Sequence, residues 1–320
     1  MSIDQAVDAF LLHRRLKGCS ADTLNLYRRR LHFWQQWHTT RYATECIDLI
    51  SIDHLRTFFV YLTDEHVAHQ NNPYRPATGK RLTPASVDRF YRILRAFWRF
   101  LDDENLLTSK QLRFFERGRI PRPQIPERER PAATESLITE LLTACDLAHD
   151  EYPERSARDR LTVLLLYESG MRVSELCHLT DSDLAIRDCA AKVIGKGGRF
   201  RWVFWSDRTA QALADYLPIR RGPVGDFVIR GCSTRNDGGA MTRDAVRCAL
   251  KRLSASVGVT LPHSAPVHCL LHGFVHAALD AGLDISEVAQ LAGHTDIATT
   301  MIYARRDRNR LQKSHQRIFR

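Results

Sequence analysis

The second half of the chain contains side chains that together could break a phosphodiester bond without a metal ion. They follow in chain order as Arg172, Lys196, His268, His294 and Tyr303. Such a reaction requires a nucleophile, a proton donor to the departing oxygen, and fixed positive charge around the five-coordinate phosphorus. Taken singly, each residue has an ordinary alternative as a packed tyrosine, a buried histidine or a solvated lysine. The surrounding motifs must therefore decide.

Each of these residues lies within a longer motif. The motifs read Gly170-Met-Arg-Val-Ser-Glu-Leu176, Val193-Ile-Gly-Lys-Gly-Gly-Arg199, His268-Cys-Leu-Leu-His272, Leu291-Ala-Gly-His-Thr-Asp296 and Thr299-Thr-Met-Ile-Tyr303. In this order and spacing they resemble the tyrosine recombinase family, which contains phage integrases and Xer-like site-specific recombinases. The resemblance extends over nearly the whole chain.

The resemblance implies a reaction and a role for each residue. Tyr303 would attack the phosphate to form a 3′-phosphotyrosyl bond, and a hydroxyl of the partner strand would then attack that bond. Lys196 would be the general acid, His268 would support acid and base catalysis, and Arg172 and His294 would donate to phosphate oxygens. Bond energy is conserved in this scheme, so we expect no nucleotide cofactor and no metal.

The resemblance also implies partners. We expect double-stranded DNA with paired recombination sites and a tetramer on that DNA, formed by this chain alone or with a partner recombinase. In the family the acidic residue at Glu175 is a structural support; a surface helix charge is the plain alternative. Integration, excision, transposition and dimer resolution all stay open.

Leu271 departs from the family pattern. That pattern is His-x-x-Arg, and leucine can neither donate a hydrogen bond nor balance phosphate charge. Losing one such donor costs ~10²–10³ in rate, and an arginine at a phosphoryl transition state contributes ~10³–10⁵. Three explanations stay open: a nearby cation such as Arg199, Arg201 or protonated His272 compensates; the chain is an accessory recombinase that relies on a partner; or the change inactivates it. A non-enzymatic, sequence-specific DNA-binding protein on the same fold is the alternative function.

The charge of the chain favours a polyanionic partner. The 320 residues have a formal net charge of +10, and residues 1–130 hold 22 Lys and Arg against 15 Asp and Glu, so the excess leans toward the N-terminal part. Apolar periodicity predicts helices over 3–16, 21–38, 52–67 and 84–100, which would form a compact bundle. Arginines on two of these helices and beside the Gly-Lys-Gly-Gly turn could neutralise DNA phosphates, namely Arg28, Arg29, Arg30, Arg89, Arg92, Arg95, Arg99, Arg199 and Arg201. A solvated basic face is the alternative for the helical set.

The expected fold is mainly α-helical with a small antiparallel β-sheet. We predict a four-helix core-binding (SAM-like) DNA-binding domain over 1–110, an interdomain linker rich in proline and charge over 111–133, and an α+β tyrosine-recombinase catalytic domain over 134–303. Two strands should flank the Gly-Lys-Gly-Gly turn. The basic tail 304–320 would dock on a neighbouring subunit or simply fray against phosphate.

The remaining sequence features point to a reduced, cytoplasmic protein. The eight cysteines are scattered without the paired spacing of a zinc site or a disulfide framework. The N-terminus lacks the pattern of a secretory signal, and no stretch approaches the length of a membrane span.

Overall fold

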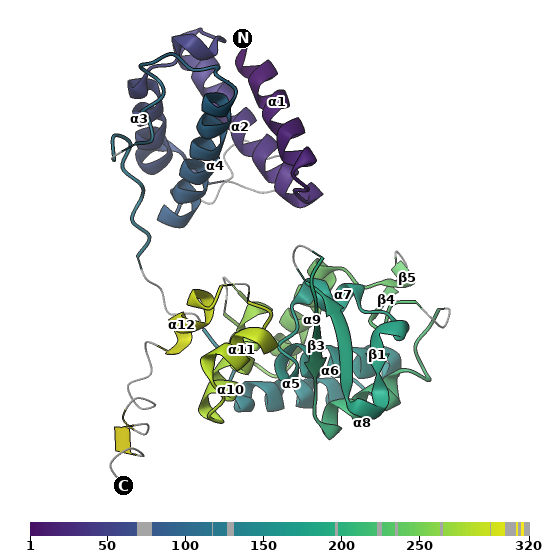
Figure 1. Ribbon diagram of the computed structural model, residues 1–320. Coiled ribbons are helices and arrows are strands. Elements are labelled where there is room, and N and C mark those ends of the chain that lie inside the picture. The colour runs from purple at the N-terminus through teal and green to yellow at the C-terminus, as the bar shows by residue number, and fades with distance from the viewer. Residues whose placement is uncertain are drawn as a thin grey trace. The chain divides into compact units, whose positions relative to one another are not determined.

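The computed structural model describes residues 1–68, 79–116, 118–126, 131–195, 198–222, 226–233, 236–262, 265–294, 296–304, 312 and 315–316. The chain divides into two compact units, Met1–Arg128 and Glu129–Arg320. The fold is mainly helical with small antiparallel sheets, as the sequence predicted (Figure 1). No helix within the described residues is both long and apolar enough to cross a lipid bilayer.

Helices make up the N-terminal unit. They are α1 (Ile3–Leu16), α2 (Ala21–Tyr42), α3 (Ile52–Val60) and α4 (Pro84–Asp103), with a 3₁₀ turn over Ile47–Leu49 and a π-helical turn over Tyr61–Glu65. Ser2, Ser20, Ser51 and Thr83 cap the helix starts, because each side-chain oxygen accepts a hydrogen bond from the backbone N–H three residues later. The third helix, predicted over 52–67, is a regular α-helix only to Val60, and the π-helical turn continues it to Glu65.

The core of this unit is aromatic. Phe10, Trp34, Phe58, Phe90 and Phe97 are fully or almost fully buried, and their rings pack edge-to-face or tilted against neighbours at centroid distances of about 5–6 Å. One face of α4 contributes to this core while its arginines at 89, 92, 95 and 99 stay exposed. The predicted division of this helix into an apolar and a basic face is thus what the structure shows.

The predicted linker begins too early. The side-chain amide of Gln111 donates to the carbonyl oxygens of Ile47 and Ile50, at 2.7 and 2.9 Å, and Phe114 and Ile120 are buried in the core of the N-terminal unit. Residues 111–116 and 118–126 therefore belong to that unit, and the division falls after Arg128. The prediction failed because isolated apolar residues among prolines and charges show no periodicity.

The C-terminal unit is built around a buried central helix. Its helices are α5 (Glu135–Leu147), α6 (Pro153–Glu168), α7 (Val173–His178), α8 (Asp207–Tyr216), α9 (Arg243–Ser256), α10 (His268–Asp280), α11 (Ile285–Leu291) and α12 (Ala298–Ala304). Leu161, Leu164, Leu165 and Leu166 of α6 are buried, and α6 packs against α5, α8, α9 and α10. Because apolar residues cover much of its circumference, this helix anchors the elements that surround it.

Short strands complete the unit. The strands β1 (Leu184–Ala185), β2 (Ala190–Ile194) and β3 (Phe200–Phe204) form an antiparallel sheet in the order β1-β2-β3, and β4 (Arg230–Ser233) pairs with β5 (Asn236–Ala240). The pair β2–β3 is the hairpin predicted around the glycine-rich turn. It is in register from Ala190 opposite Phe204 to Ile194 opposite Phe200.

Candidate active site

Arg172 lies in the sharp turn between α6 and α7. Gly170 makes the turn possible, because its φ of +63° favours glycine and a Cβ there would lie 2.5 Å from the ring of Phe274. The Arg172 guanidinium donates from Nη1 to Oε1 of Glu175 at 3.1 Å and from Nη2 to the carbonyl oxygen of Gly293 at 2.7 Å. The cation is therefore fixed between the start of α7 and the turn that precedes His294.

Glu175 supports two arginines at once. Its Oε2 accepts hydrogen bonds from the backbone N–H of Arg172 at 2.8 Å and from Nη2 of Arg201 at 2.9 Å. The carboxylate is buried, where an unpaired charge would be strongly unfavourable. The geometry favours the structural-support role implied by the resemblance over that of a surface charge.

Arg201 was predicted to contact phosphate, but its side chain is mostly buried in the structure. Only 13% of its side chain is exposed, and its guanidinium also donates to the carbonyl oxygens of Leu291 and Gly170, at 2.5 and 2.9 Å. Burial lowers its pKa, although Glu175 partly offsets that effect. Arg201 thus ties β3 to α11 and to the Gly170 turn, and it is not free to move toward Leu271.

Arg199 is exposed beside the hairpin turn, whereas Lys196 lies outside the described residues.

His268 opens helix α10 with its side chain exposed at one edge. Partial desolvation, followed by the positive charge of nearby Arg172, lowers its pKa. The imidazole is therefore neutral at neutral pH, and a neutral imidazole can accept a proton.

His294 is positioned from both sides. Gly293 precedes it with a φ of +63°, and a Cβ there would lie 2.5 Å from Nε of Arg201 and 2.9 Å from Nη1 of Arg172. On the other side, Nδ1 of His294 lies 2.7 Å from Oγ1 of Thr300, which is fully buried on α12. This contact helps to fix the orientation of the imidazole ring. Thr300 was not predicted as a site residue, although the Thr299-Thr300 pair lies in the tyrosine motif.

Tyr303 and Leu271 are buried together. They share an apolar cluster with Val275, Leu279 and Val288, and the rings of His272 and His276 lie with centroids 5.5 Å from the Tyr303 ring. Tyr303 also borders a cleft of about 700 Å³ between residues 131–135 and α10.

His272 was one of the cations proposed to compensate for Leu271. Its Nδ1 lies 3.0 Å from the carbonyl oxygen of Pro131, which makes Nδ1 the donor of that hydrogen bond. Leu271, where the sequence resemblance predicts an arginine, is thus an apolar side chain in the cluster that contains Tyr303.

The predicted DNA-binding arginines of the N-terminal unit fall into two groups. Arg28, Arg29, Arg89, Arg95 and Arg99 are exposed. Arg30 is half-buried with its guanidinium 4.4 Å from the centroid of the Phe90 ring, and burial together with Arg89 and Arg29 lowers its pKa.

Arg92 is exposed but pairs with a buried carboxylate. Its Nε lies 2.9 Å from Oδ2 of Asp88, which also binds Arg122. A pocket of about 440 Å³ on this face is lined by Arg92, Arg95 and Arg99 together with Arg14 of α1. The sequence analysis missed Arg14 because it lies on a different helix.

Metal-assisted chemistry has no evident protein ligands in the described part of the chain. Within those residues no three His, Cys, Asp or Glu side chains gather as a metal site would require.

Comparison with known proteins identifies the family. A model of the phage integrase family matches residues 133–310. The tyrosine recombinase XerD of Proteus mirabilis is 30% identical over 319 residues, covering 98% of this chain and 91% of that protein. XerC of Xanthomonas campestris pv. campestris is 30% identical over 311 residues, covering 96% and 86%.

Solved structures share the fold. The Tn1549 transposon integrase in complex with transposon right end DNA has a TM-score of 0.72 at 18% identity, with 100% of both chains covered. The XerH recombinase bound to a palindromic difH substrate has a TM-score of 0.68 at 16% identity, covering 94% of this chain and 81% of that one. With more than half of the chain matched by the family model, this protein belongs to the phage integrase family of tyrosine recombinases.

Proposed function

We propose that this protein recombines double-stranded DNA at specific sites through a 3′-phosphotyrosyl bond to Tyr303. The observation that carries the proposal is the fixed position of Arg172, held to the Gly293 carbonyl oxygen at 2.7 Å. This bond brings the arginine motif and the His294 motif together although 121 residues separate Arg172 from Gly293. The positive charge of Arg172 also contributes to the lowered pKa of His268, after the larger effect of burial.

In the proposed reaction the hydroxyl of Tyr303 attacks the phosphorus and the 5′-oxygen of the next nucleotide leaves. Neutral His268 is suited to accept the tyrosine proton, and Lys196 gives a proton to the leaving oxygen. Arg172 and His294 stabilise the charge that builds on the non-bridging oxygens. A 5′-hydroxyl of the partner strand then attacks the phosphotyrosyl bond and releases Tyr303, so no cofactor is consumed.

Unaided cleavage by this chain is weak in our proposal. Leu271 supplies no donor, and neither Arg201 nor His272 replaces one, because both already donate to main-chain oxygens. Loss of one such donor lowers the rate by ~10²–10³. A partner recombinase therefore supplies part of the cleavage in this proposal. The protein acts on paired sites as a tetramer in the cytoplasm. The tail 304–320, for which docking on a neighbouring subunit and fraying against phosphate both stay open, lies largely outside the described residues.

Covalent trapping tests this function. Binding sites are first selected from a random duplex library, and a nicked suicide substrate is then built on the selected sequence. We expect a slow protein–DNA adduct that Tyr303→Phe abolishes and Leu271→Arg accelerates. An adduct that survives Tyr303→Phe would refute Tyr303 as the nucleophile.

The burial of Leu271 and Tyr303 in one apolar cluster supports a second candidate, a DNA-binding protein without its own cleavage activity. It predicts selection of a specific site but no adduct from the unmodified chain, with or without a second recombinase. An adduct that forms with the unmodified chain and depends on Tyr303 excludes this candidate.

A further inference from the structure

The outer face of strand β3 exposes aromatic side chains to solvent. Phe200, Trp202 and Phe204 are 63%, 48% and 50% exposed, whereas Arg201 and Val203 between them face the interior. Opposite Phe200 on β2, Ile194 is also exposed. An apolar surface of this kind on a soluble unit indicates a binding site.

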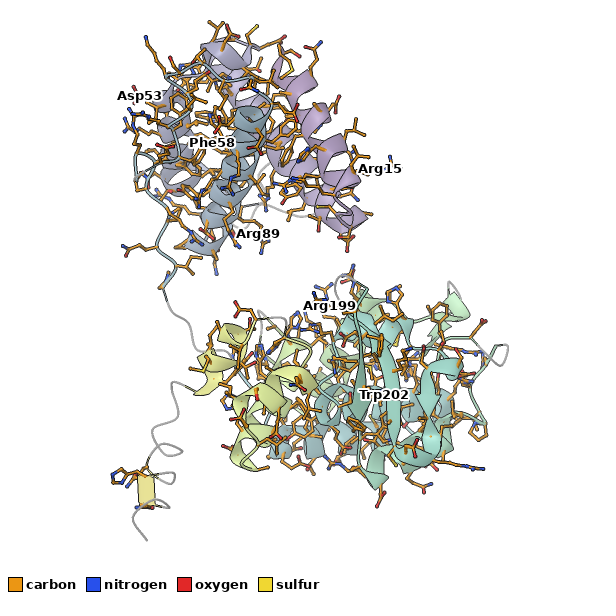
Figure 2. All side chains as sticks on the ribbon, in the orientation of Figure 1. Arg15, Asp53, Phe58, Arg89, Arg199 and Trp202 are labelled. Atoms are coloured by element: carbon orange, nitrogen blue, oxygen red, sulfur yellow. The ribbon has the colours of Figure 1, made fainter. Side chains whose placement is uncertain are left out.

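The strands that carry these rings contain basic residues and no acidic ones. Residues 190–204 contain Lys192, Lys196, Arg199 and Arg201 and no Asp or Glu. Nζ of Lys192 lies 4.3 Å from the centroid of the Phe200 ring, and Arg199 is exposed at the start of the same strand (Figure 2). A ligand that matches this face must combine flat apolar groups with negative charge.

We propose that this aromatic face, Phe200, Trp202 and Phe204, binds the unpaired bases of single-stranded DNA. Alternate residues of a strand are about 6.8 Å apart, which is twice the ~3.4 Å spacing of stacked bases. One base therefore fits between neighbouring aromatic positions and can stack on both. Lys192 and Arg199 then lie close enough to pair with the phosphates of the same strand.

The aromatic face distinguishes unpaired from paired DNA. In a duplex the faces of the bases are covered by their neighbours, so the rings have nothing to stack on. The contact between Lys192 and Phe200 does not block binding, because a cation–π contact at an exposed site is weak. Strand exchange in the proposed function requires strands to leave their duplex, and this face would hold a strand in that state.

Binding of a labelled oligothymidylate, followed by fluorescence anisotropy with the full chain, tests the proposal. Each of Trp202→Ala and Phe204→Ala should weaken single-strand binding about tenfold, while affinity for a duplex of equal length changes less than twofold. Trp202→Phe, which keeps a ring, should restore most of the affinity. Leu147→Ala and Ile186→Ala, which remove exposed apolar groups elsewhere, should change neither.

Other results would overturn the proposal. Unchanged oligothymidylate binding in the double variant Trp202→Ala, Phe204→Ala would show that the face serves another ligand, such as an acidic protein segment. Equal losses for single strand and duplex would show that the rings only support general DNA binding. Because these positions are exposed, melting temperatures should match the unmodified chain. The oligothymidylate need not be cut, so this test can fail while cleavage by Tyr303 stands.

Discussion

Leu271 and Tyr303 pack in one apolar cluster, with only 8% and 5% of their surfaces exposed. A guanidinium at position 271 would have to share this cluster or push past it to reach a phosphate. Catalytic charge and local packing therefore compete at this position.

We expect Leu271→Arg to speed adduct formation on the suicide substrate by ~10² or more while lowering the free energy of unfolding by about 2 kcal/mol. Denaturant titration and the adduct assay, run on the same preparation, measure both effects. Leu271→Met keeps the volume without the charge, so it should change the free energy of unfolding by less than about 1.5 kcal/mol and leave the rate unaltered. A rate unchanged by Leu271→Arg would mean that position 271 does not limit cleavage.

Gly293 holds the turn on which Arg172, Arg201 and His294 converge. A methyl group there would press on Nε of Arg201 at 2.5 Å and would be strained by the φ of +63°. Gly282 has a φ of +92° but open space around its Cβ position, so Gly282→Ala carries backbone strain without the clash. We expect Gly282→Ala to cost about 1 kcal/mol and to leave adduct formation unchanged.

Gly293→Ala should cost clearly more stability than Gly282→Ala and reduce adduct formation at least tenfold, because it displaces Arg172. Thermal unfolding compares the two variants, and the suicide substrate reports the rate. Equal stabilities and equal rates of adduct formation in the two variants would mean that Arg172 and Arg201 can shift without affecting stability or cleavage.

The sequence predicted elements well where local signals are strong. The caps at Ser20 and Thr83 and the glycine turn at Gly170 mark helix ends by backbone chemistry that acts over a few residues. Arg201 was misjudged because an arginine between two aromatic residues is expected to face solvent. Its burial depends on carbonyl oxygens of Gly170 and Leu291, 31 and 90 residues away.

The start of the linker was mispredicted for the same reason, a contact between residues that lie far apart in the chain. Gln111 binds carbonyl oxygens more than 60 residues earlier in the chain, and no local pattern carries that information. Likewise, the motif could mark Leu271 as standing where the family pattern has an arginine, but only the fold could show that this leucine shares a buried apolar cluster with Tyr303.

Thr300 should position His294 without touching the substrate itself. Its hydroxyl lies 2.7 Å from Nδ1 of His294, and loss of this bond would let the ring turn. We expect Thr300→Val to slow adduct formation about tenfold, whereas Thr300→Ser keeps the hydroxyl and most of the rate. Adduct formation by the two variants on the suicide substrate separates the cases. Equal losses of rate in both variants would indicate a packing role alone.

The N-terminal unit should lose stability in acid through the buried His38, which contacts the partly exposed His54. Nε2 of His38 lies 3.0 Å from Nδ1 of His54, and Tyr42 stacks on His54 with centroids 3.8 Å apart. Burial, followed by the neighbouring His54, lowers the pKa of His38 to about 4. Between pH 6.5 and about 4 the unfolded chain therefore binds a proton that the folded chain excludes, so stability falls as the pH falls.

The loss attributable to His38 should reach about 3 kcal/mol at pH 4 relative to pH 7. Urea titrations followed by tryptophan fluorescence can measure it, because Trp34 lies with its centroid 5.8 Å from the His38 ring. The glutamine in His38→Gln cannot titrate. The free energy of unfolding of this variant should therefore depend less steeply on pH over this range, with a slope smaller by about one proton at most, even if the variant is less stable at pH 7. The exposed His149 provides the control, since His149→Gln should retain the full dependence. A buried neutral His38 must contribute to the fall of stability with falling pH. If His38→Gln loses stability in acid as steeply as the unmodified chain, other groups therefore govern acid unfolding.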